Sequence, residues 1–442
     1  MMSWTKVDRR VNFTVGMAKI FREWSPEQNV MFPPSVLDLV PRGHLVHFIR
    51  NVVSEQLDLS EILGSYSEER GYPPYHPVMM TALLLYANVV RIYSSRRIAR
   101  ACQERVDFMA LTGMQKPDFR TISLFRLRHL GAIKGLFGQV LKLCQKAGMV
   151  KLGHVALDGT KIQANASKHQ SMSYGKMKKA QRQLEAEIDR WFEEAERLDR
   201  EEDQLYGADK TGDELPDWVA DKQQRVEKIR QAKAALEAEA RAELEGGPDP
   251  NKTGHKPRPT GTPRDKVQRN FTDPESRIMK SSHGYVQGYN AQAAVDAHCQ
   301  VIVGQALINS GSDAHQMIPM LRQIRTNLGR QAREISADSA YCSELNLKAL
   351  NKHHVRGYVA TDRQNKDRNV GSLVKRMRQR LRQGGWRSRY RLRKQTVEPV
   401  FGQIKQARGF RQFLLRGLTK VAAEWSLLCT AHNLLKLAAV VG

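Results

Sequence analysis

Between residues 154 and 360 the chain alternates short apolar runs with segments of helical spacing. The order is strand, long charged insertion, antiparallel hairpin, helix, strand, helix, strand and helix. Strands that alternate with amphipathic helices pack as a sheet with helices on its faces. We therefore predict an α/β fold with a mixed sheet, interrupted by an α-helical hairpin insertion and preceded by an all-α N-terminal domain.

Apolar runs and turn residues give the positions of these elements. Strands are expected at 154–157, 285–295, 301–308, 335–337 and 357–360, and the hairpin is expected to turn at 297–300. Helices are expected at 314–328, capped by Ser312 and Asp313, and at 343–352. This order is that of an RNase H-like α/β domain, which we place at residues 151–442.

The insertion at residues 172–246 is rich in Lys, Glu, Arg, Ala and Gln. Apolar residues recur at spacings of three, four and seven in 172–206 and in 216–245, which predicts an antiparallel helical hairpin joined through 207–215. Lys222 and Lys233 fall on the second apolar seam. Residues 247–270, rich in Gly, Pro, Thr, Lys and Arg, are expected to form a flexible basic linker.

Three acidic residues stand in distinctive surroundings. Asp158 and Asp338 each follow an apolar run, and Glu398 follows a dense arginine tract. Because an α/β sheet binds ligands at the carboxyl ends of its strands, the two aspartates are expected to lie together. Oxygen ligands without Cys or His at metal-ligand spacing favour Mg²⁺ or Mn²⁺ over zinc. Lys405 lies seven residues after Glu398 and shares its helical face if Pro399 does not kink the helix.

Each of these acids also has a simpler interpretation. Asp158 and Gly159 could form a turn, and Asp338 could cap the helix that follows it. Glu398 could be an acid at a helix N-terminus, with Pro399 at the first helical position. Several other polar residues are weaker site candidates, each with a structural explanation: Asp296 as a turn acid, His283, His298 and His315 as scaffold or DNA-facing residues, and Cys342 as a buried thiol.

The sequence motifs around the three acids resemble those of a known family. LDGTKIQANAS, ADSAYCSE and TVEPVFGQIK are similar to the three blocks of the DDE-type transposases of bacterial insertion sequences, and the stretches 272–280 and 424–435 match as well. By this resemblance Asp158, Asp338 and Glu398 are the catalytic and metal-binding residues, and Lys405 is the lysine of the last block. The family often has Tyr and Arg at fixed offsets before the glutamate. Those offsets hold Arg391 and Lys394 here, while Tyr390 and Arg393 stand one residue earlier, so their roles stay open.

The resemblance implies an enzyme that cuts the ends of an insertion element and joins them to target DNA by phosphoryl transfer with two Mg²⁺ or Mn²⁺ ions. Its partners would be double-stranded DNA, as terminal inverted repeats and as target, and a second copy of the chain or a higher assembly. Two alternatives remain: a metal-dependent nuclease of the same fold, and a catalytically idle or regulatory DNA-binding protein.

The charge of the chain favours a polyanionic partner. Formal net charge is +25, with 71 Lys and Arg among 442 residues, and residues 363–394 hold 13 of these cations against one acid. Such a density suits nucleic acid, although a solvated basic face is the ordinary alternative. We expect DNA phosphates to be contacted by arginines of this tract, namely Arg376, Arg380, Arg387, Arg389, Arg391 and Arg393.

Residues 1–150 are expected to form a helical DNA-binding domain, after a loosely held arm at 1–31. Two short helices at 94–102 and 117–126, with Ser94 and Asp118 as N-caps, suggest a helix-turn-helix. Arg120 and Arg126 lie on its second helix and would face DNA. A helical bundle with a solvated basic face is the alternative.

The five cysteines are scattered without a C-x-x-C pair, which favours a reducing cytoplasm over a disulfide framework, and the start of the chain lacks the apolar core of a signal peptide. A cytoplasmic, nucleoid-associated protein is expected. The apolar stretch 421–441 contains Glu424, His432, Asn433 and Lys436, so a buried helix is expected there rather than a membrane span.

Overall fold

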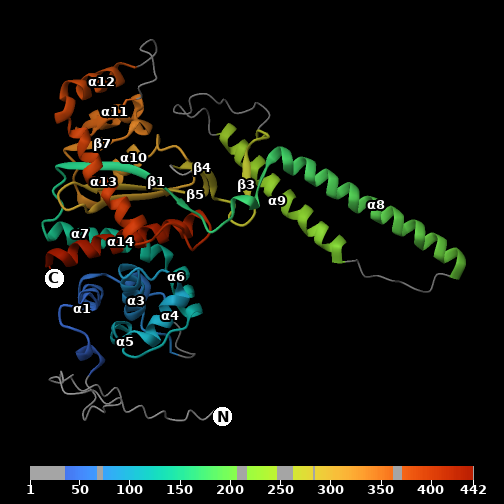
Figure 1. Ribbon diagram of the computed structural model, residues 1–442, viewed down its shortest axis with the longest axis horizontal. Helices are drawn as coiled ribbons and strands as arrows, with labels where there is room; N and C mark the ends of the chain where they lie inside the picture. The colour runs from blue at the N-terminus through green and yellow to red at the C-terminus, as the bar shows by residue number, and fades with distance from the viewer. Residues whose placement is uncertain are drawn as a thin grey trace, which may run out of the picture.

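A computed structural model describes residues 35–66, 73–206, 217–245, 262–281, 284–361 and 371–441. Figure 1 shows a helical N-terminal part, a sheet with helices around it, and a pair of long helices that projects away from the sheet. The α/β fold with a mixed sheet is as predicted. The expected arm at 1–31, the connection 207–215, His283 and most of the linker 247–270 lie outside the described residues.

The main sheet has six strands in the order β4-β5-β1-β7-β8, with β6 also paired to β5. Their bounds are β1 (His154–Gln163), β4 (Arg277–Ser281), β5 (Gly284–Asp296), β6 (Ile302–Ile308), β7 (Glu334–Ala337) and β8 (Arg356–Val359). β1 runs antiparallel to β5 and parallel to β7, and β7 is parallel to β8. The predicted hairpin and the two later parallel strands are confirmed.

The N-terminal part consists of short helices. They are α1 (Leu45–Asn51), α2 (Ser60–Leu63), α3 (Pro77–Val89), α4 (Ser95–Glu104), α5 (Val106–Thr112), α6 (Phe119–Arg128) and α7 (Leu130–Lys146). Asp118 caps α6, because its side chain accepts hydrogen bonds from the backbone N–H groups of Arg120 and Thr121. Ser94 precedes α4 without a side-chain cap bond. The two predicted helices and the one between them are therefore present.

The later helices are α10 (Met317–Leu328), α11 (Glu344–Lys352), α12 (Ser372–Gly384), α13 (Leu392–Gly402) and α14 (Leu418–Val441). α11 begins as predicted, with Ser343 as its cap. α10 begins at Met317, three residues later than predicted, and its N-cap is Gln316. The expected cap residue Asp313 turns instead toward the sheet, where it accepts hydrogen bonds from Asn290 and Gln292.

α14 is the helix that joins the two halves of the molecule. It packs against α7 and α3 of the N-terminal part and against β6 of the sheet. Trp425, Leu428 and Cys429 are fully buried on it, and one apolar core runs from the N-terminal helices into the sheet. The predicted buried helix is confirmed. No helix within the described ranges is both long enough and apolar enough to cross a membrane.

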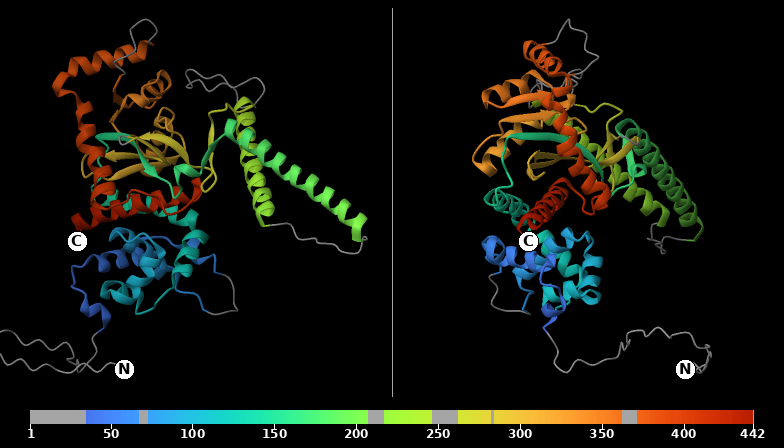
Figure 2. Two further views of the ribbon diagram at one scale, coloured as in Figure 1. Left: turned by 45° about the vertical axis from the view of Figure 1, so that its right-hand side comes forward. Right: turned by 60° about the vertical axis from the view of Figure 1, so that its left-hand side comes forward.

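The insertion forms a projecting helix pair, α8 (Tyr174–Tyr206) and α9 (Asp217–Glu245), which Figure 2 shows from two further sides. A two-stranded ribbon, β2 (Ser171–Ser173) with β3 (Gln268–Asn270), joins it to the sheet domain. The pair is antiparallel, as predicted, because Lys222 bonds Glu187 while Lys233 bonds Gln181. The side chains that pack between the two helices include Tyr174, Met177, Ile229, Ala232 and Leu236. We call this pair the arm.

Candidate active site

Asp158 lies in the middle of β1, whereas a strand ending at residue 157 was predicted. β1 continues to Gln163 because residues 159–163 keep pairing with β5. The expectation that Asp158 ends a strand is therefore wrong, and so is the turn at Gly159. On the other side of β1, however, the pairing with β7 stops at Ala156 opposite Ser336. Asp158 and Asp338 each lie two residues beyond that pair. The two aspartates therefore lie at the same height along the sheet, at the point where the pairing of β1 with β7 has ended.

Asp338 also caps a short helix, as the simpler interpretation proposed. Its Oδ1 accepts a hydrogen bond of 3.0 Å from the N–H of Ala340 in η4 (Ser339–Tyr341). Burial raises the pKa of Asp338, and the charge of Asp313 raises it further. Burial likewise raises the pKa of Asp158 to about 6, although the charge of Arg393 lowers it. Both carboxyl groups therefore lie where a nearby cation would stabilise the charged form.

Glu398 is in the interior of α13, and Pro399 follows it inside the helix. The interpretation of Glu398 as an acid at a helix N-terminus is therefore wrong. A proline cannot donate to the carbonyl four residues before it, which leaves that group without its helical partner. Here the carbonyl is that of Gln395, and it accepts a hydrogen bond of 3.1 Å from the side chain of Gln300. This substitute bond allows α13 to continue through the proline.

Arg393 connects two of the three acids. Its Nη1 lies 2.5 Å from Oδ2 of Asp158, and its Nη2 lies 3.0 Å from Oε1 of Glu398. The side chains of Arg393 and Asp158 are 15% and 14% exposed, while that of Glu398 is 44% exposed. The guanidinium also interacts electrostatically with Asp338. One cation thus lies among all three predicted catalytic residues, on the helix that carries the third.

Lys405 lies in a π-helical turn, η8 (Gln403–Ala407), directly after α13. Its Nζ donates a hydrogen bond of 2.9 Å to the backbone carbonyl of Lys161 on β1. Burial lowers the pKa of Lys405, and repulsion from Lys161 adds to this effect. The side chain is therefore half-buried against the strand that carries Asp158. The change from α to π geometry at Gly402 alters the simple two-turn relation expected between Glu398 and Lys405.

A buried polar network beside the acids was missed by the sequence analysis. Asp313 accepts hydrogen bonds of 2.5 Å from Asn290 and 2.7 Å from Gln292, and Lys161 lies 3.3 Å from it. The hydroxyl of Tyr341 in turn bonds Gln292. The signal in the sequence was two amides, Asn290 and Gln292, which alternate with apolar residues in a strand that is buried on both faces.

Gly159 is required by this network. A Cβ atom at this position would lie 2.8 Å from Oδ1 of Asp313, 2.9 Å from Oδ1 of Asn290 and closer still to Gln292. Such contacts are shorter than real Cβ atoms make. The residue after Asp158 is therefore glycine because the polar side chains of the network approach the β1 backbone.

The arginines of the tract differ in their contacts: some bond other parts of the protein and others have exposed side chains. Arg389 forms an ion pair with Glu334, at the opposite end of β7 from Asp338, and Arg380 donates a hydrogen bond of 3.0 Å to the carbonyl of Gly357. Three other arginines of the tract, Arg376, Arg387 and Arg391, have exposed side chains. Arg393 is the tract arginine that bonds Asp158 and Glu398. Residues 363–370, at the start of the tract, lie outside the described residues.

The two arginines predicted on α6 differ. Arg120 is exposed near the ring of Phe119. Arg126 is 8% exposed, donates to Ser95 of α4 and is attracted to the buried Glu424 of α14. This burial contradicts the expectation that Arg126 faces DNA, because its guanidinium interacts with residues of α4 and α14 inside the protein.

The weaker candidates have structural roles. Asp296 accepts hydrogen bonds from the N–H groups of Leu152 and His298, so it is a turn acid. Burial raises the pKa of Cys342 to about 11, which leaves its thiol uncharged and unreactive at neutral pH. Within the described part of the chain, the side-chain hydrogen bonds of Asp296 go to Leu152 and His298 and to none of the three acids.

Among the described residues, no group of three or more His, Cys, Asp and Glu side chains is gathered closely enough to hold a metal ion. Asp158, Asp338 and Glu398 are oxygen donors of the kind that Mg²⁺ and Mn²⁺ prefer. The positive charge among them belongs to Arg393. The donor set therefore fits a hard divalent cation in its chemistry.

The fold and the site define an α/β protein with carboxylates on two adjacent strands and on a neighbouring helix. Two family models identify its kind: Transposase domain (DUF772) matches residues 34–128, and Transposase DDE domain matches residues 254–434. These matches confirm the DDE-type insertion-sequence transposase that the motifs indicated, and they connect the chain with DNA transposition. The second match includes Asp338 and Glu398 but begins after Asp158. No curated protein and no solved structure shows significant similarity to the chain.

Proposed function

We propose that this protein cuts the ends of its insertion element and joins them to target DNA, with Asp158, Asp338 and Glu398 as the catalytic residues. The observation that supports this most directly is the position of Arg393. Because one guanidinium bonds both Asp158 and Glu398, these two carboxylates converge on the same positive charge. Asp338, level with Asp158 on the adjacent strand, is the third member.

The strand order supports an RNase H-like catalytic domain at residues 151–442, interrupted by the arm. In that order an antiparallel hairpin lies on one side of β1 and two parallel strands on the other. β1 then carries the first acid, β7 is followed by the second acid, and α13 brings the third.

Asp158, Asp338 and Glu398 would hold two divalent cations. When bound, Mg²⁺ or Mn²⁺ supplies the positive charge that activates an attacking oxygen and stabilises the leaving oxygen. The chain itself orients the carboxylates: β5 and the buried network fix β1, and the cap bond to Ala340 fixes Asp338. Lys405, held at the carbonyl of Lys161, is the residue we assign to a DNA phosphate.

We assign two chemical steps to the site. In the first, a water oxygen attacks a phosphorus at the element end, the bond from phosphorus to the 3′ oxygen breaks, and a 3′ hydroxyl is released. In the second, that 3′ oxygen attacks a target phosphorus in line, and the target 3′ oxygen leaves as it gains a proton. Neither step forms a bond between DNA and the protein.

Recognition of DNA is assigned to the N-terminal helices and to the arginine tract. Arg120 on α6 and the exposed Arg376, Arg387 and Arg391 are the side chains we expect at phosphates. Because a transposition complex joins two DNA ends, we expect a dimer or higher assembly on DNA. We expect the protein to act in the cytoplasm, at the nucleoid where its DNA would lie.

Two other functions of the same site give different products. A nuclease would cut without joining, and an idle DNA-binding protein would do neither. The pairing of Asp158 and Glu398 through one cation favours an active site over a decayed one. Strand joining, measured as covalent transfer of a labelled element end to plasmid DNA, separates the transposase from the nuclease.

The substitutions Asp158→Asn, Asp338→Asn and Glu398→Gln keep side-chain shape and remove the charge that binds metal. Each is expected to reduce Mg²⁺-dependent cleavage of end-bearing DNA at least about a thousandfold, a loss expected of residues that act as a unit. Binding of the same DNA should change little. A variant that cleaved at near the normal rate would remove that residue from the catalytic set.

A further inference from the structure

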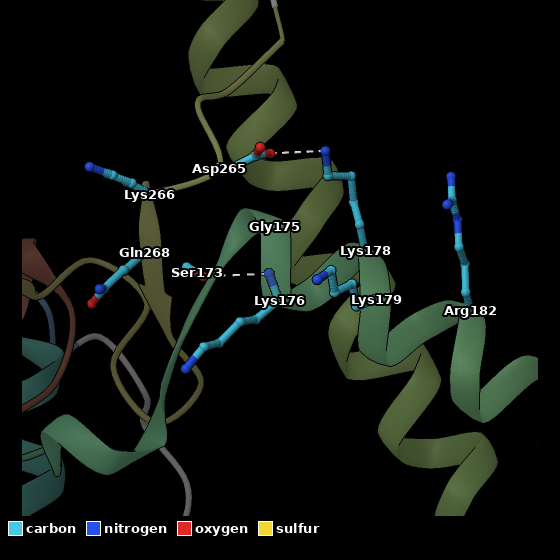
Figure 3. Close-up of a pocket in the computed structure, with 9 residues that line it drawn as sticks. All are labelled: Ser173, Gly175, Lys176, Lys178, Lys179, Arg182, Asp265, Lys266 and Gln268. Atoms are coloured by element: carbon cyan, nitrogen blue, oxygen red, sulfur yellow. Dashed lines mark hydrogen bonds and ion pairs between the residues drawn. The ribbon is translucent and has the colours of Figure 1, made fainter.

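A basic cleft lies at the base of the arm, outside the site described above. It has a volume of about 630 Å³ and lies where β2 leads into α8 and the chain approaches β3. Figure 3 shows its side chains coming from these two segments. Five of them are cations and one is an acid, namely Lys176, Lys178, Lys179, Arg182, Lys266 and Asp265. We call this feature the arm cleft.

Among the described residues, most of the positive charge in the arm cleft has no acidic partner. Lys178 forms an ion pair of 2.9 Å with Asp265. The other four cations are exposed, and no acid in the described part of the chain lies in ion-pair range of them. Like charges this close repel one another, so their grouping is unfavourable unless a polyanion binds.

These cations are not explained by packing of the arm. The side of α8 that packs against α9 is occupied by Tyr174 and Met177, with Ala180 and Leu184 partly buried beside them. Lys178 and Lys179 stand four and three residues before Arg182, respectively, at spacings that lie on one helical face. The arm would therefore pack equally well with neutral residues at these exposed positions.

The arm cleft is connected to the acids by the course of the chain. From Asp158, β1 continues five residues to Gln163, a distance of about 17 Å at the usual rise of a strand. A second polar hollow begins there, and it includes Lys168, His169, Arg416 and the 68% exposed ring of Tyr285. β2 then leads into the arm cleft. Exposed cations thus follow the chain from the candidate active site to the arm.

We propose that the arm cleft binds the phosphate backbone of duplex DNA next to the bond that is cut. Its long, exposed side chains come from two segments, and among them there is no apolar anchor of the kind that a protein partner would need. Phosphates are contacted by such side chains without base recognition. The location relative to the scissile bond rests on the proposed function, whereas the binding of DNA by the cleft does not.

The test uses the full chain and a 40-base-pair duplex of random sequence, with the dissociation constant measured over a range of KCl concentrations. The triple variant Lys176→Gln, Lys179→Gln, Arg182→Gln removes three charges from the cleft. Each phosphate contact contributes roughly 0.9 to the slope of log affinity against log salt, so the slope should fall by about 2–3. The matched control Arg190→Gln, Arg225→Gln, Lys228→Gln removes three exposed charges elsewhere on the arm and should lower the slope by less than about 1.

Equal slopes for the two triple variants would overturn the proposal, because general charge and not the cleft would then determine affinity. Poly-glutamate is a second probe: if the cleft variant lost poly-glutamate binding but kept the slope for DNA, the cleft would be a site for an acidic protein. Circular dichroism confirms the fold of each variant. Normal cleavage by Asp158→Asn would refute the proposed function, while the salt slope would still decide the function of the cleft.

Discussion

Arg393 determines the charge balance of the candidate active site. Three carboxylates and Asp313 interact there, and burial raises the pKa values of Asp158 and Asp338. Arg393 offsets this repulsion through two hydrogen bonds, and its own pKa is raised mainly by Asp158 despite the opposing effect of burial. The guanidinium therefore holds the acids in place, and we expect a divalent cation bound by the same carboxylates to displace it.

Removal of this guanidinium should make stability depend on metal. Arg393→Gln leaves Asp158 without its countercharge, and we expect the free energy of unfolding at pH 7.5 to fall by about 2–4 kcal/mol. Mg²⁺ or Mn²⁺ should then raise the melting temperature more in this variant than in the natural protein, because the ion replaces the missing charge. The measurement is calorimetry with and without metal. Equal metal-induced shifts would contradict the displacement, and in the double variant Asp158→Asn, Arg393→Gln the extra shift should disappear.

Gly159 allows a second prediction at the scale of one residue. Gly159→Ala forces Gln292 and Asp313 away from β1, so we expect a loss of about 1–3 kcal/mol in stability together with loss of cleavage. The matched control is Gly153→Ala, where no atom lies within 4 Å of an added Cβ. Urea denaturation and the cleavage assay compare the two. If Gly159→Ala were as stable and active as the control, the close contact between the network side chains and the β1 backbone would not be required.

At the scale of elements, α14 holds the turn between β5 and β6. His432 lies 3.0 Å from the carbonyl of Gln300, Lys436 bonds the side chain of Gln300, and Asn433 bonds both backbone groups of Ile302. Gln300 has a positive φ of 57°, a conformation that needs support from its surroundings. Polar residues in a largely apolar helix thus connect it to the sheet rather than to solvent.

His432 should make the protein sensitive to acid. Burial lowers the pKa of His432 from 6.5 to about 4, with smaller contributions from Arg408 and Lys436. The unfolded chain therefore binds this proton first as pH falls, so the stabilisation is complete above pH 6.5 and is lost as pH falls through about 4. The loss is about 3 kcal/mol in total. His432→Gln keeps a donor and does not titrate, so urea midpoints at pH 7 and pH 4 should differ less in this variant. Identical pH profiles would contradict the assignment.

The elements that the sequence predicted correctly are those with local signals. The β5–β6 hairpin, β7, α11 and the arm follow from apolar spacing and turn residues. The length of β1 could not be predicted, because residues 159–163 include a single large apolar residue, Ile162, and belong to the strand only through β5. The simpler interpretation of Glu398 as an N-terminal acid was wrong for a related reason: Pro399 is typical of a helix start, and only Gln300, a residue distant in sequence, satisfies the carbonyl of Gln395 and lets the helix continue.

At the scale of the whole molecule, the domain boundary expected at residue 150 does not divide the hydrophobic core, which extends across it. α14, at the end of the described chain, packs against α3 and α7, and Arg126 on α6 interacts with Glu424 on α14. The three acids could be selected from the sequence by their surroundings, but Asp313, Asn290, Gln292 and the bridging role of Arg393 required the fold. Their partners lie far apart along the chain, where no spacing rule applies.

The bond between Arg393 and Asp158 joins residues 235 positions apart, and Lys405 reaches Lys161 across 244 positions. A ribosome that has translated β1, the arm and all the other strands has therefore still not produced the helix that completes the site. On the proposed function, the growing chain therefore lacks one of its catalytic residues until α13 has been synthesised. Products that stop before α13 would lack Glu398 and also α14, the helix that joins the N-terminal helices to the sheet in one core, so a premature stop in the gene would remove a part of the site and a part of the core together.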